Sequence, residues 1–572
     1  MRYIETDRGY RLDIGRFSLS QSTFLLIAAF VVGIGGGYGT VLFRAMIYGE
    51  TRLAFYVIAP RLHALGWFDV VPVVGLGGLL TVFITQRFAK EAQGHGTPHV
   101  LEAVALRGGI LHPRGILATT VAAATTLGFG GSAGREGPII QIGATIGSFV
   151  GQLAKAPAPM LRSLVACGAA AGISATFNAP IGGVFFASEV ILGNFAPRQF
   201  ASIVVSSVVA AIIGRSVFGD HPSFSAQAFH LVSPLELLLY VLLGVFAAAW
   251  AWGFVRLLYA LEDVFRRIGR VYVRALIGFG LVGFIGIAFP QVFGVGYPNV
   301  QAVLASHVPA WHAFLLSVLK PVATSLTLGG GGSGGVFAPS LYTGAMLGDA
   351  FGRIVHQMFP AWTATAAAYG LVGMAAVFAA TSEAPITAIM IVFEMSNDYT
   401  IILPLMISVV VATLIGRRLI GGTIDSIALT RRGIDWERLR AARPLTRVRV
   451  TMVEHPPQVV ATPDDMLADV AAKLEDTPEF VVPVCRDGRF LGVVLASDIA
   501  AELVSTPLAT VARCIRPVSS TLERTDTLEQ AAVAMADPQT PMLPVLERET
   551  GKLLGIVTRR DVLNAYRDRV SF

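Results

Sequence analysis

The sequence contains few charged residues and few cysteines for its length. Asp, Glu, Lys and Arg make up 14% of its 572 residues, whereas soluble globular proteins carry about 25%. The mean hydropathy is +0.64, so most of the chain is expected to lie in lipid, which excludes an ordinary soluble protein. Cys167, Cys485 and Cys514 are far apart and show no metal-ligand spacing. We therefore expect no disulfide framework and a reducing, cytoplasmic side.

Features of several other protein classes are missing as well. The first apolar run follows a polar, arginine-containing stretch, so no signal peptide is predicted. We find no nucleic-acid motif, and no nucleophile, metal cluster or acid–base pair of the kind that an enzyme needs. The sequence therefore predicts a protein that is not an enzyme and that binds neither nucleic acid nor metal.

The net charge of +6 agrees with arginine-containing segments on both sides of the apolar region. By the positive-inside rule, both termini are predicted to face the cytoplasm, which implies an even number of crossings. We expect an integral protein of a bacterial inner membrane. The arginines that flank the apolar region are Arg2, Arg8, Arg11, Arg16, Arg417, Arg418, Arg431 and Arg432.

Many of the apolar runs are shorter than the roughly 20 residues that span a bilayer, and Gly or Pro interrupts them. Non-helical backbone is tolerated at membrane depth only inside protein or beside water. This pattern predicts an all-α polytopic domain with broken or re-entrant helices, as in transporters and channels. The expected organisation is a cytoplasmic segment at 1–19, a membrane domain at 20–430, a linker at 431–450 and an α/β tail at 451–572.

The membrane domain contains an internal duplication. TLGFGGSAGREGP at 126–138 matches TLGGGGSGGVFAP at 327–339, and both copies continue as P-x4-G-A-x2-G. Further along, GAAAGISATFNAPIGGVFFASE at 168–189 matches GMAAVFAATSEAPITAIMIVFE at 373–394. Paired segments interrupted by Gly and Pro in two halves indicate a transporter binding site at the repeat interface.

Each duplicated glycine loop ends in a proline that is followed by a helical pattern. Proline is favoured in the first turn of a helix, and a helix N-terminus presents free N–H groups and about half a positive charge. Two such termini would form an anion site from which the anion can still leave. Glu136, beside Arg135, is then a candidate gate, because its carboxylate can occupy the same site. The alternative is an Arg135–Glu136 pair that only neutralises itself.

These stretches resemble the CLC family of chloride channels and chloride/proton exchangers. GREGP at 134–138 matches a family signature without change, GGVFAP at 334–339 matches a second, and GHGTPH at 94–99 corresponds to a third. The resemblance covers residues of about 20 to 430. It implies a CLC fold of about 18 helices in two inverted halves, and a homodimer with one pore in each subunit.

The resemblance also implies roles for single residues. Glu136 would be the gating glutamate, and the amides of Arg135, Glu136 and Gly137 would face an outer anion site. The amides of Val336 and Phe337 would face a central site, together with His95. The family usually has serine where this chain has His95, and neutral imidazole can donate one hydrogen bond as serine does. Alternatively, His95 turns away and only shapes its loop.

Two further departures bear on the mechanism. The exchangers carry an internal proton-transferring glutamate directly after the position of Glu189, and here that position is Val190. Because Glu189 has a counterpart in Glu394, we expect it to be structural. The family's inner tyrosine is also missing from residues 424–430, and we expect Ile427 or Ala428 in its place. Both departures favour a channel.

The charged residue Lys320 precedes a proline at the end of an apolar run. It would either add positive potential near the anion path or snorkel to the membrane interface.

The tail resembles the paired CBS module that many CLC members carry. VVPVCRDGRFLGVVLASDI at 481–499 is similar to MLPVLERETGKLLGIVTRRDV at 542–562. The second copy contains a G-x-x-T-x-x-D stretch with Thr558 and Asp561, which can hold the ribose of an adenine nucleotide; the first has Leu495 instead of the hydroxyl residue. The alternative for Thr558 is a plain helix N-cap. Such a nucleotide is the one ligand other than the anion that we expect.

The main functional prediction is anion conduction, most simply of chloride, through a voltage-gated, channel-like pore that Glu136 gates. The alternative is a proton-coupled chloride or nitrate exchanger of the same fold. A CBS-linked divalent cation transporter is a distant alternative, because it would need clustered carboxylates or carbonyl oxygens where this chain presents N–H donors.

Overall fold

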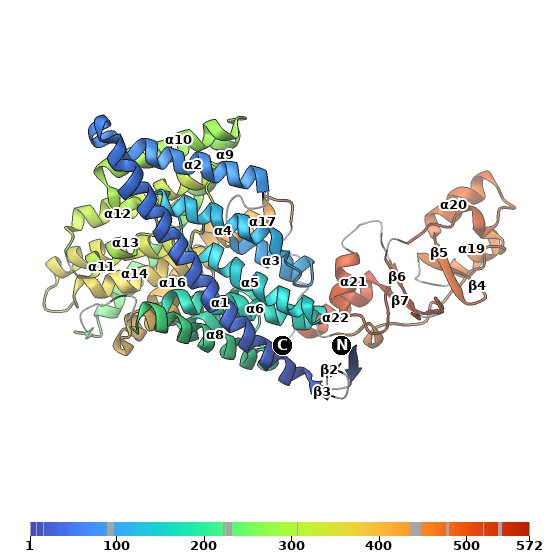
Figure 1. The fold of residues 1–572 in the computed structure, drawn as a ribbon. Coiled ribbons are helices and arrows are strands. Elements are labelled where there is room, and N and C mark those ends of the chain that lie inside the picture. The colour runs from blue at the N-terminus through green and yellow to red at the C-terminus, as the bar shows by residue number, and fades with distance from the viewer. Residues whose placement is uncertain are drawn as a thin grey trace. The chain divides into compact units, whose positions relative to one another are not determined.

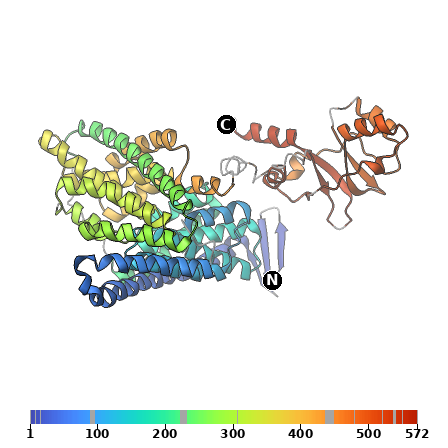
Figure 2. The same ribbon diagram turned by 90° about the horizontal axis from the view of Figure 1, so that it is seen from above.

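The computed structural model divides the chain into two compact units, Met1–Arg432 and Gly433–Phe572, here called the membrane unit and the tail unit. Figures 1 and 2 show both as ribbons. The structure describes residues 2–6, 9–14, 17–88, 96–220, 224, 231–305, 307–434, 445, 448–475, 477, 480–518, 520–535, 540, 542–548 and 550–570. His95 and most of the predicted linker at 431–450 lie outside these residues.

The membrane unit begins with a three-stranded antiparallel sheet, followed by helices throughout its described residues. The strands are β1 (Arg2–Thr6), β2 (Gly9–Ile14) and β3 (Phe17–Ser20). The first repeat comprises α1 (Gln21–Arg52), α2 (Val70–Phe88), α3 (Gly96–Leu106), α4 (Pro113–Gly128), α5 (Glu136–Leu153), α6 (Ala158–Phe177), α7 (Pro180–Phe186) and α8 (Pro197–Phe218).

The second repeat has the same order of helices and ends with one more short helix. Its elements are α9 (Glu236–Arg266), α10 (Val271–Ala288), α11 (Tyr297–Leu304), α12 (Ala310–Gly329), α13 (Phe337–Met358), α14 (Ala366–Ser382), α15 (Pro385–Ser396), α16 (Ile402–Ile420) and α17 (Ile424–Thr430). Shorter helical turns are Leu53–Ile58, Ala59–Phe68, Ala187–Leu192, Pro290–Val292 and Tyr399–Ile401.

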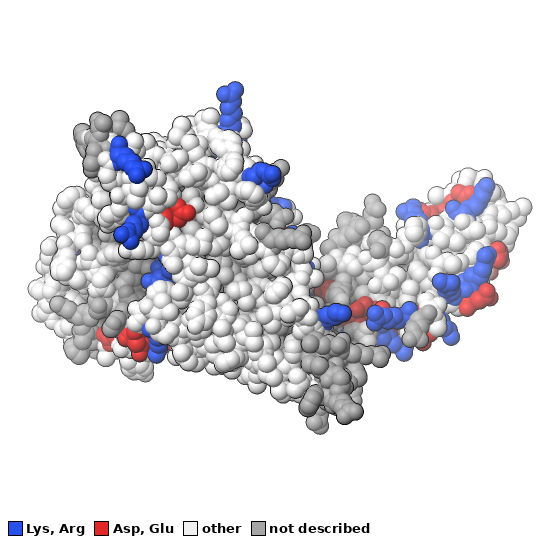
Figure 3. Space-filling model, viewed as in Figure 1, with Lys and Arg blue, Asp and Glu red and all other residues white. Residues whose placement is uncertain are grey.

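The mixture of long and short helices agrees with the predicted interrupted membrane domain. In the described residues, 8 helices are long and apolar enough to cross a membrane, and several others, such as Ala366–Ser382, are apolar but shorter. Figure 3 shows a broad area of the membrane unit almost free of Lys, Arg, Asp and Glu. Large side chains such as Leu42, Phe246 and Leu414 are exposed there or on other faces of the unit, as expected of residues that contact lipid.

The two repeats pack in the same way. Helix α5 packs on α6 as α13 packs on α14, and α1 packs on α8 as α9 packs on α16. The helices α5 and α6 approach closely at Gly143 and Gly168, where an added Cβ on either residue would overlap the carbonyl oxygen of the other. The corresponding pair Gly344 and Gly373 makes the same approach. The repeated glycines of the sequence are therefore sites of close backbone packing.

A glutamate of each repeat also caps the N-terminus of a helix in the other repeat. The Glu394 carboxylate accepts hydrogen bonds from the N–H groups of Ile181 (3.0 Å) and Gly182 (2.6 Å) at the start of α7. The Glu189 carboxylate accepts one from the N–H of Thr387 (2.8 Å) at the start of α15. A carboxylate is stabilised at a helix N-terminus by the free donors and by the dipole. These contacts support the structural role expected for Glu189.

The symmetry breaks directly after α7. Helix α15 is α-helical from Pro385 to Ser396, whereas Pro180–Phe186 is followed by a π-helical turn, Ala187–Leu192. Short π-helical segments are frequent at functional sites. Val190 lies in this turn.

The tail unit contains two similar α/β halves. Strands β4 (Val481–Arg486) and β5 (Arg489–Leu495) pair antiparallel, as do β6 (Met542–Leu546) and β7 (Leu553–Thr558), and each pair contains a register shift at the equivalent place. The resemblance of the two halves therefore extends to this irregularity. The helices are α19 (Leu467–Glu475), α20 (Ala496–Ser505), α21 (Leu528–Ala534) and α22 (Arg559–Val570), with short turns at Val450–Met452 and Val511–Arg513.

We predict that Gly143→Ala lowers the thermal stability of the purified protein in detergent. The new methyl group must push α5 away from α6, and overpacking of this kind costs about 1–3 kcal/mol. Gly253→Ala is the matched control, because Gly253 also lies in a long helix but has no atom within 4 Å of an added Cβ. Equal unfolding temperatures for the two variants would contradict the close packing of α5 on α6.

Candidate functional site

The two glycine-rich loops meet in the interior of the membrane unit. The N–H of Gly134 donates to the carbonyl of Gly335 (2.6 Å), and the N–H of Gly335 donates to the carbonyl of Gly134 (2.7 Å). Symmetric hydrogen bonds hold the loops from behind: the Ser132 N–H donates to Thr327 Oγ1 (2.9 Å). The Ser333 N–H likewise donates to the hydroxyl of Thr126 (3.1 Å). The N-termini of α5 and α13 are thereby brought side by side.

Glu136 connects these two helix starts. It is the first residue of α5 and is fully buried. The N–H of Ala338, in the first turn of α13, donates to Glu136 Oε2 (3.3 Å), and the Tyr297 hydroxyl donates to Oε1 (2.7 Å). The carboxylate of one repeat therefore lies on the helix N-terminus of the other, which is where the sequence predicts an anion site.

Arg135 and Lys320 place positive charge near this carboxylate. Arg135 Nε is 3.8 Å from Glu136 Oε1, and its guanidinium lies 5.0 Å from the centre of the Tyr297 ring. Lys320 is fully buried, and its Nζ donates to the carbonyls of Val292 (2.9 Å) and Gly294 (2.7 Å). The expectation that Lys320 snorkels to the interface is wrong, because its ammonium group is held by backbone carbonyls inside the protein.

A small cavity lies against the same helix starts. Its volume is about 30 Å³, more than the roughly 10–15 Å³ that a water molecule needs. Of the predicted anion-site residues, Gly137, Val336 and Phe337 line it, whereas Arg135 and Glu136 do not. The other described lining residues are Thr97, Phe186, Val190, Gly335, Ser340, Phe378, Thr381, Ser382, Ile424 and Asp425.

The two residues of α17 that line this cavity are not those expected. Asp425 and Ile424, from the first turn of α17, border it, whereas Ile427 packs into a hydrophobic cluster and Ala428 lines a different cavity. The prediction of Ile427 or Ala428 at this place is therefore wrong. Helix α17 starts only at Ile424, so its second turn already faces away from the small cavity.

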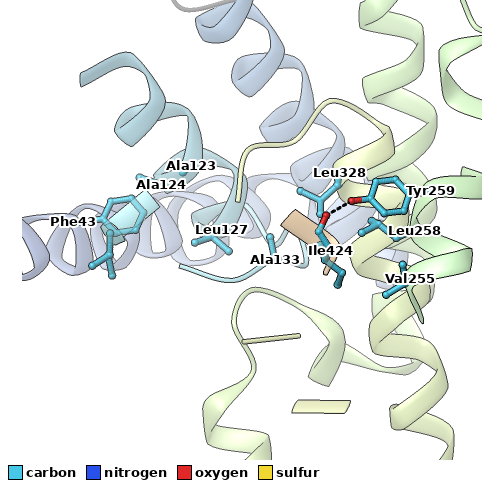
Figure 4. Close-up of a cluster of buried hydrophobic side chains, with 11 residues drawn as sticks. Phe43, Ala123, Ala124, Leu127, Ala133, Val255, Leu258, Tyr259, Leu328 and Ile424 are labelled. Atoms are coloured by element: carbon cyan, nitrogen blue, oxygen red, sulfur yellow. Dashed lines mark hydrogen bonds between the residues drawn. The ribbon is translucent and has the colours of Figure 1, made fainter. Parts of the chain in front are cut away.

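Several contacts fix the start of α17. The Tyr259 hydroxyl of α9 donates to the Ile424 carbonyl (2.6 Å), as Figure 4 shows within the hydrophobic cluster. Thr423 and Ser426 form a capping box, in which each side chain accepts the N–H of the other residue (2.9 Å each). These hydrogen bonds set the direction in which the side chain of Asp425 leaves the helix.

A larger cavity of about 230 Å³ adjoins the second turn of α17. Four arginines, one glutamate and apolar residues line it, so it attracts anions. Its described lining residues are Leu258, Tyr259, Glu262, Arg266, Arg274, Leu328, Gly329, Gly331, Ala428, Arg431 and Arg432.

In the tail unit, Thr558 and Asp561 lie together but bond to each other. The N–H and hydroxyl of Thr558 donate to Asp561 Oδ2 (2.8 and 2.6 Å), and His455 Nε2 lies 3.2 Å from the same oxygen. This is the arrangement of a helix N-terminus closed by its own side chains. A nucleotide would have to compete with these contacts.

Tyr297 and Asp425 belong to the site but were not predicted from the sequence. Tyr297 comes from the start of α11 and Asp425 from α17, both far from the glycine loops in sequence. The one signal for Asp425 was the missing family tyrosine, which pointed to the right segment. For Tyr297 the sequence carried no signal, because nothing in its own segment identifies the partner.

Comparison with known proteins agrees with this architecture. The family model described as voltage gated chloride channel matches residues 77–417, and the CBS domain model matches residues 450–505 and 511–568. The first match covers more than half of the chain. It includes both glycine loops and the helices that begin at them.

Individual relatives cover most of the membrane unit. A ClcB-like chloride channel protein of Ralstonia nicotianae is 32% identical over 431 residues, which is 73% of this chain and 99% of the relative. An H(+)/Cl(-) exchange transporter ClcA of Yersinia pestis is 30% identical over 450 residues, which is 77% of this chain and 92% of the relative.

Solved structures show the same fold. A slow cyanobacterial Cl-/H+ antiporter superposes with a TM-score of 0.66 at 28% identity, over 72% of this chain and 98% of that one. A eukaryotic CLC transporter superposes with a TM-score of 0.65 at 21% identity, over 95% of this chain and 99% of that one. The chain belongs to the CLC family of chloride channels and exchangers and carries a C-terminal pair of CBS domains.

Proposed function

We propose that this CLC protein exchanges chloride for protons across the membrane, with Glu136 as the group that alternates with the anion. One observation carries the proposal: the Glu136 carboxylate lies on the N-terminus of α13, within 3.3 Å of the Ala338 N–H. An anion bound to the same helix start would meet this carboxylate. The two negative groups compete for the same donors, so chloride binds there only when the carboxylate leaves or takes up a proton.

The site holds Glu136 by contacts that a proton can weaken. Tyr297 and Ala338 donate to its two oxygens, and hydrogen bonds to a charged acceptor contribute about 1.5–3 kcal/mol each. A protonated carboxyl group accepts more weakly and no longer gains from the helix dipole. Proton binding therefore frees the helix start for chloride, and this couples the two ions.

Exchange replaces the channel as our first interpretation. The relative from Yersinia and the cyanobacterial structure are named as a proton–chloride exchanger and a Cl-/H+ antiporter. The channel remains the second candidate because Val190 cannot carry a proton and lines the small cavity. The exchanger and the channel differ in one respect: an exchanger needs a group other than Val190 that brings protons to Glu136.

The remaining features of the proposal are those that the family resemblance implies. We propose a homodimer with one anion path in each subunit, placed in a bacterial inner membrane with both termini in the cytoplasm. The central anion site would include the amides of Val336 and Phe337 and, from outside the described residues, His95. Any dependence on voltage would arise from movement of the Glu136 charge.

The direct test of exchange uses the full chain in proteoliposomes with a steep chloride gradient and no proton gradient. We expect chloride efflux to drive protons inward, measured with a pH electrode while valinomycin and potassium clamp the voltage. In Glu136→Gln, which mimics the protonated carboxyl group, chloride should still move but proton movement should fall at least tenfold. Chloride flux without proton movement in the wild type would establish a channel instead.

Tyr297→Phe should weaken the hold on the Glu136 carboxylate. Loss of one charge-assisted hydrogen bond costs about 1.5–3 kcal/mol, which corresponds to roughly a tenfold or larger change in occupancy. We expect faster chloride efflux at neutral pH and a smaller increase on acidification, measured with a chloride electrode across a pH series. Tyr342→Phe is the control, because that hydroxyl donates to the Gln291 carbonyl (3.3 Å). Identical pH profiles for both variants and the wild type would contradict the role of Tyr297.

Adenine nucleotide binding at Thr558 and Asp561 is a separate proposal. Millimolar ATP should raise the unfolding temperature of the full-length protein, since a ligand that binds only the folded state stabilises it. Asp561→Asn should abolish the increase. Asp498→Asn, at the equivalent position of the first half where Leu495 replaces the hydroxyl residue, should leave it unchanged. An equal increase in both variants would place the nucleotide elsewhere.

A further inference from the structure

The small cavity beside the helix starts contains one acid. Among the described residues that line it, Asp425 is the only ionisable side chain, and the others are glycine, hydroxyl, aromatic or aliphatic residues. A carboxylate beside an anion path opposes the anion unless it takes up a proton. Such a group in a membrane segment is a functional candidate by default.

The structure holds this acid in a defined place. Thr423 and Ser426 cap the first turn of α17, and the Tyr259 hydroxyl fixes the Ile424 carbonyl at 2.6 Å. At the other end of the helix, Arg431 forms an ion pair with Asp263 of α9. Helix α17 is therefore attached to α9 at both ends, and these contacts fix the backbone position from which the Asp425 side chain extends.

Helix α17 also borders both cavities. Its first turn, with Ile424 and Asp425, lines the cavity of about 30 Å³, and its second turn, with Ala428, lines the arginine-rich cavity of about 230 Å³. Asp425 is partly exposed rather than fully buried. It lies on the same short helix as Ala428, about one turn before it, so α17 connects the wall of the small cavity to the wall of the larger one.

None of the other described charged or titratable groups near Asp425 lines the small cavity. Tyr259 of α9 is bonded to the Ile424 carbonyl, and Arg431 is paired with Asp263. On the side of α3, His99 Nε2 lies 3.3 Å from Arg432 Nη1. None of these groups lines the small cavity, whereas Val190, at the position of the family's proton-transferring glutamate, does.

We propose that Asp425 is the inner proton-transfer acid of this protein and serves in place of the glutamate missing at Val190. The inference rests on the proposed exchange. The Asp425 carboxyl group gives its proton to water in the small cavity, which has room for a water molecule, and a proton passes from that water to the Glu136 carboxylate. Asp425 is left as a carboxylate and regains a proton from the side of the larger cavity.

The same acid explains how proton and anion movements alternate. While Asp425 is ionised, its negative charge repels chloride in the adjoining cavity, because like charges in a partly desolvated site are only weakly screened. When it is protonated, this repulsion disappears and its O–H can donate to the anion. Chloride therefore moves past Asp425 in its neutral form.

The test compares Asp425→Asn, Asp425→Ser and Asp425→Glu with the wild type, all as full-length protein in proteoliposomes. Proton and chloride fluxes are recorded together under a chloride gradient. We expect the number of protons moved per chloride to fall at least tenfold in the Asn and Ser variants, while chloride flux rises because the opposing charge is gone. Asp425→Glu should recover proton movement. Asp464→Asn, an exposed residue of the tail unit paired with Arg486 at 3.2 Å, is the matched control.

A second readout comes from Val190→Glu combined with Asp425→Asn. Because both positions line one cavity, the new carboxyl group should restore proton movement. Two neutral variants are used so that the conclusion does not depend on whether one of them folds correctly. Size-exclusion chromatography checks the folding of each variant.

The outcomes separate this inference from the proposed exchange. If the wild type and both neutral variants move protons equally well for each chloride, Asp425 is not the inner acid, although exchange stands. If folded neutral variants lose chloride and proton fluxes in the same proportion, Asp425 has only a structural role and the inference is wrong. If the wild type moves no protons, exchange itself is overturned, and the role of Asp425 in it as well.

Discussion

The site depends on a pair of hydrogen bonds between two glycine backbones. Gly134 and Gly335 bond to each other in both directions, and this contact brings the N-termini of two helices together inside an apolar unit. Each N-terminus has donors without partners in its own helix, so leaving them buried and unpaired would be costly. An anion or a carboxylate satisfies them. The backbone geometry therefore leaves N–H donors that need a negative partner. Glu136 and the permeant ion act as that partner alternately.

The positive charges near the site are arranged so that none of them holds the anion permanently. The Lys320 ammonium group donates to the carbonyls of Val292 and Gly294. The Arg135 guanidinium lies over the Tyr297 ring and near Glu136. The negative group is held chiefly by neutral donors, the Tyr297 hydroxyl and the Ala338 amide. Neutral donors bind an anion firmly enough to select it, yet weakly enough to release it.

The sequence predicted the backbone elements of this site better than the side chains that line it. Glycine and proline at repeated spacings indicated the loops and helix starts, because these residues report backbone requirements that are local. The side chains of Tyr297 and Asp425 come from other segments and reach the site only through tertiary packing, which no local pattern encodes. For α17 the segment was right and the residue was wrong. The capping box at Thr423 and Ser426 decides where the helix begins, and a shift of two or three residues changes which side chain faces the cavity.

The departures from internal symmetry lie where the chemistry is expected. Glu189 and Glu394 cap each other's repeats, so these two acids are used by the fold in both halves and are not free to carry protons. Directly after α7, however, the first repeat changes to a π-helical turn, Ala187–Leu192, which contains Glu189 and Val190. Val190 lines the small cavity, whereas the second repeat continues as an ordinary helix. Helix α17, the additional helix at the end of the second repeat, brings Asp425 to the same wall. An acid lost from one element of the cavity is thus matched by an acid on another, and a proton path needs only one of them.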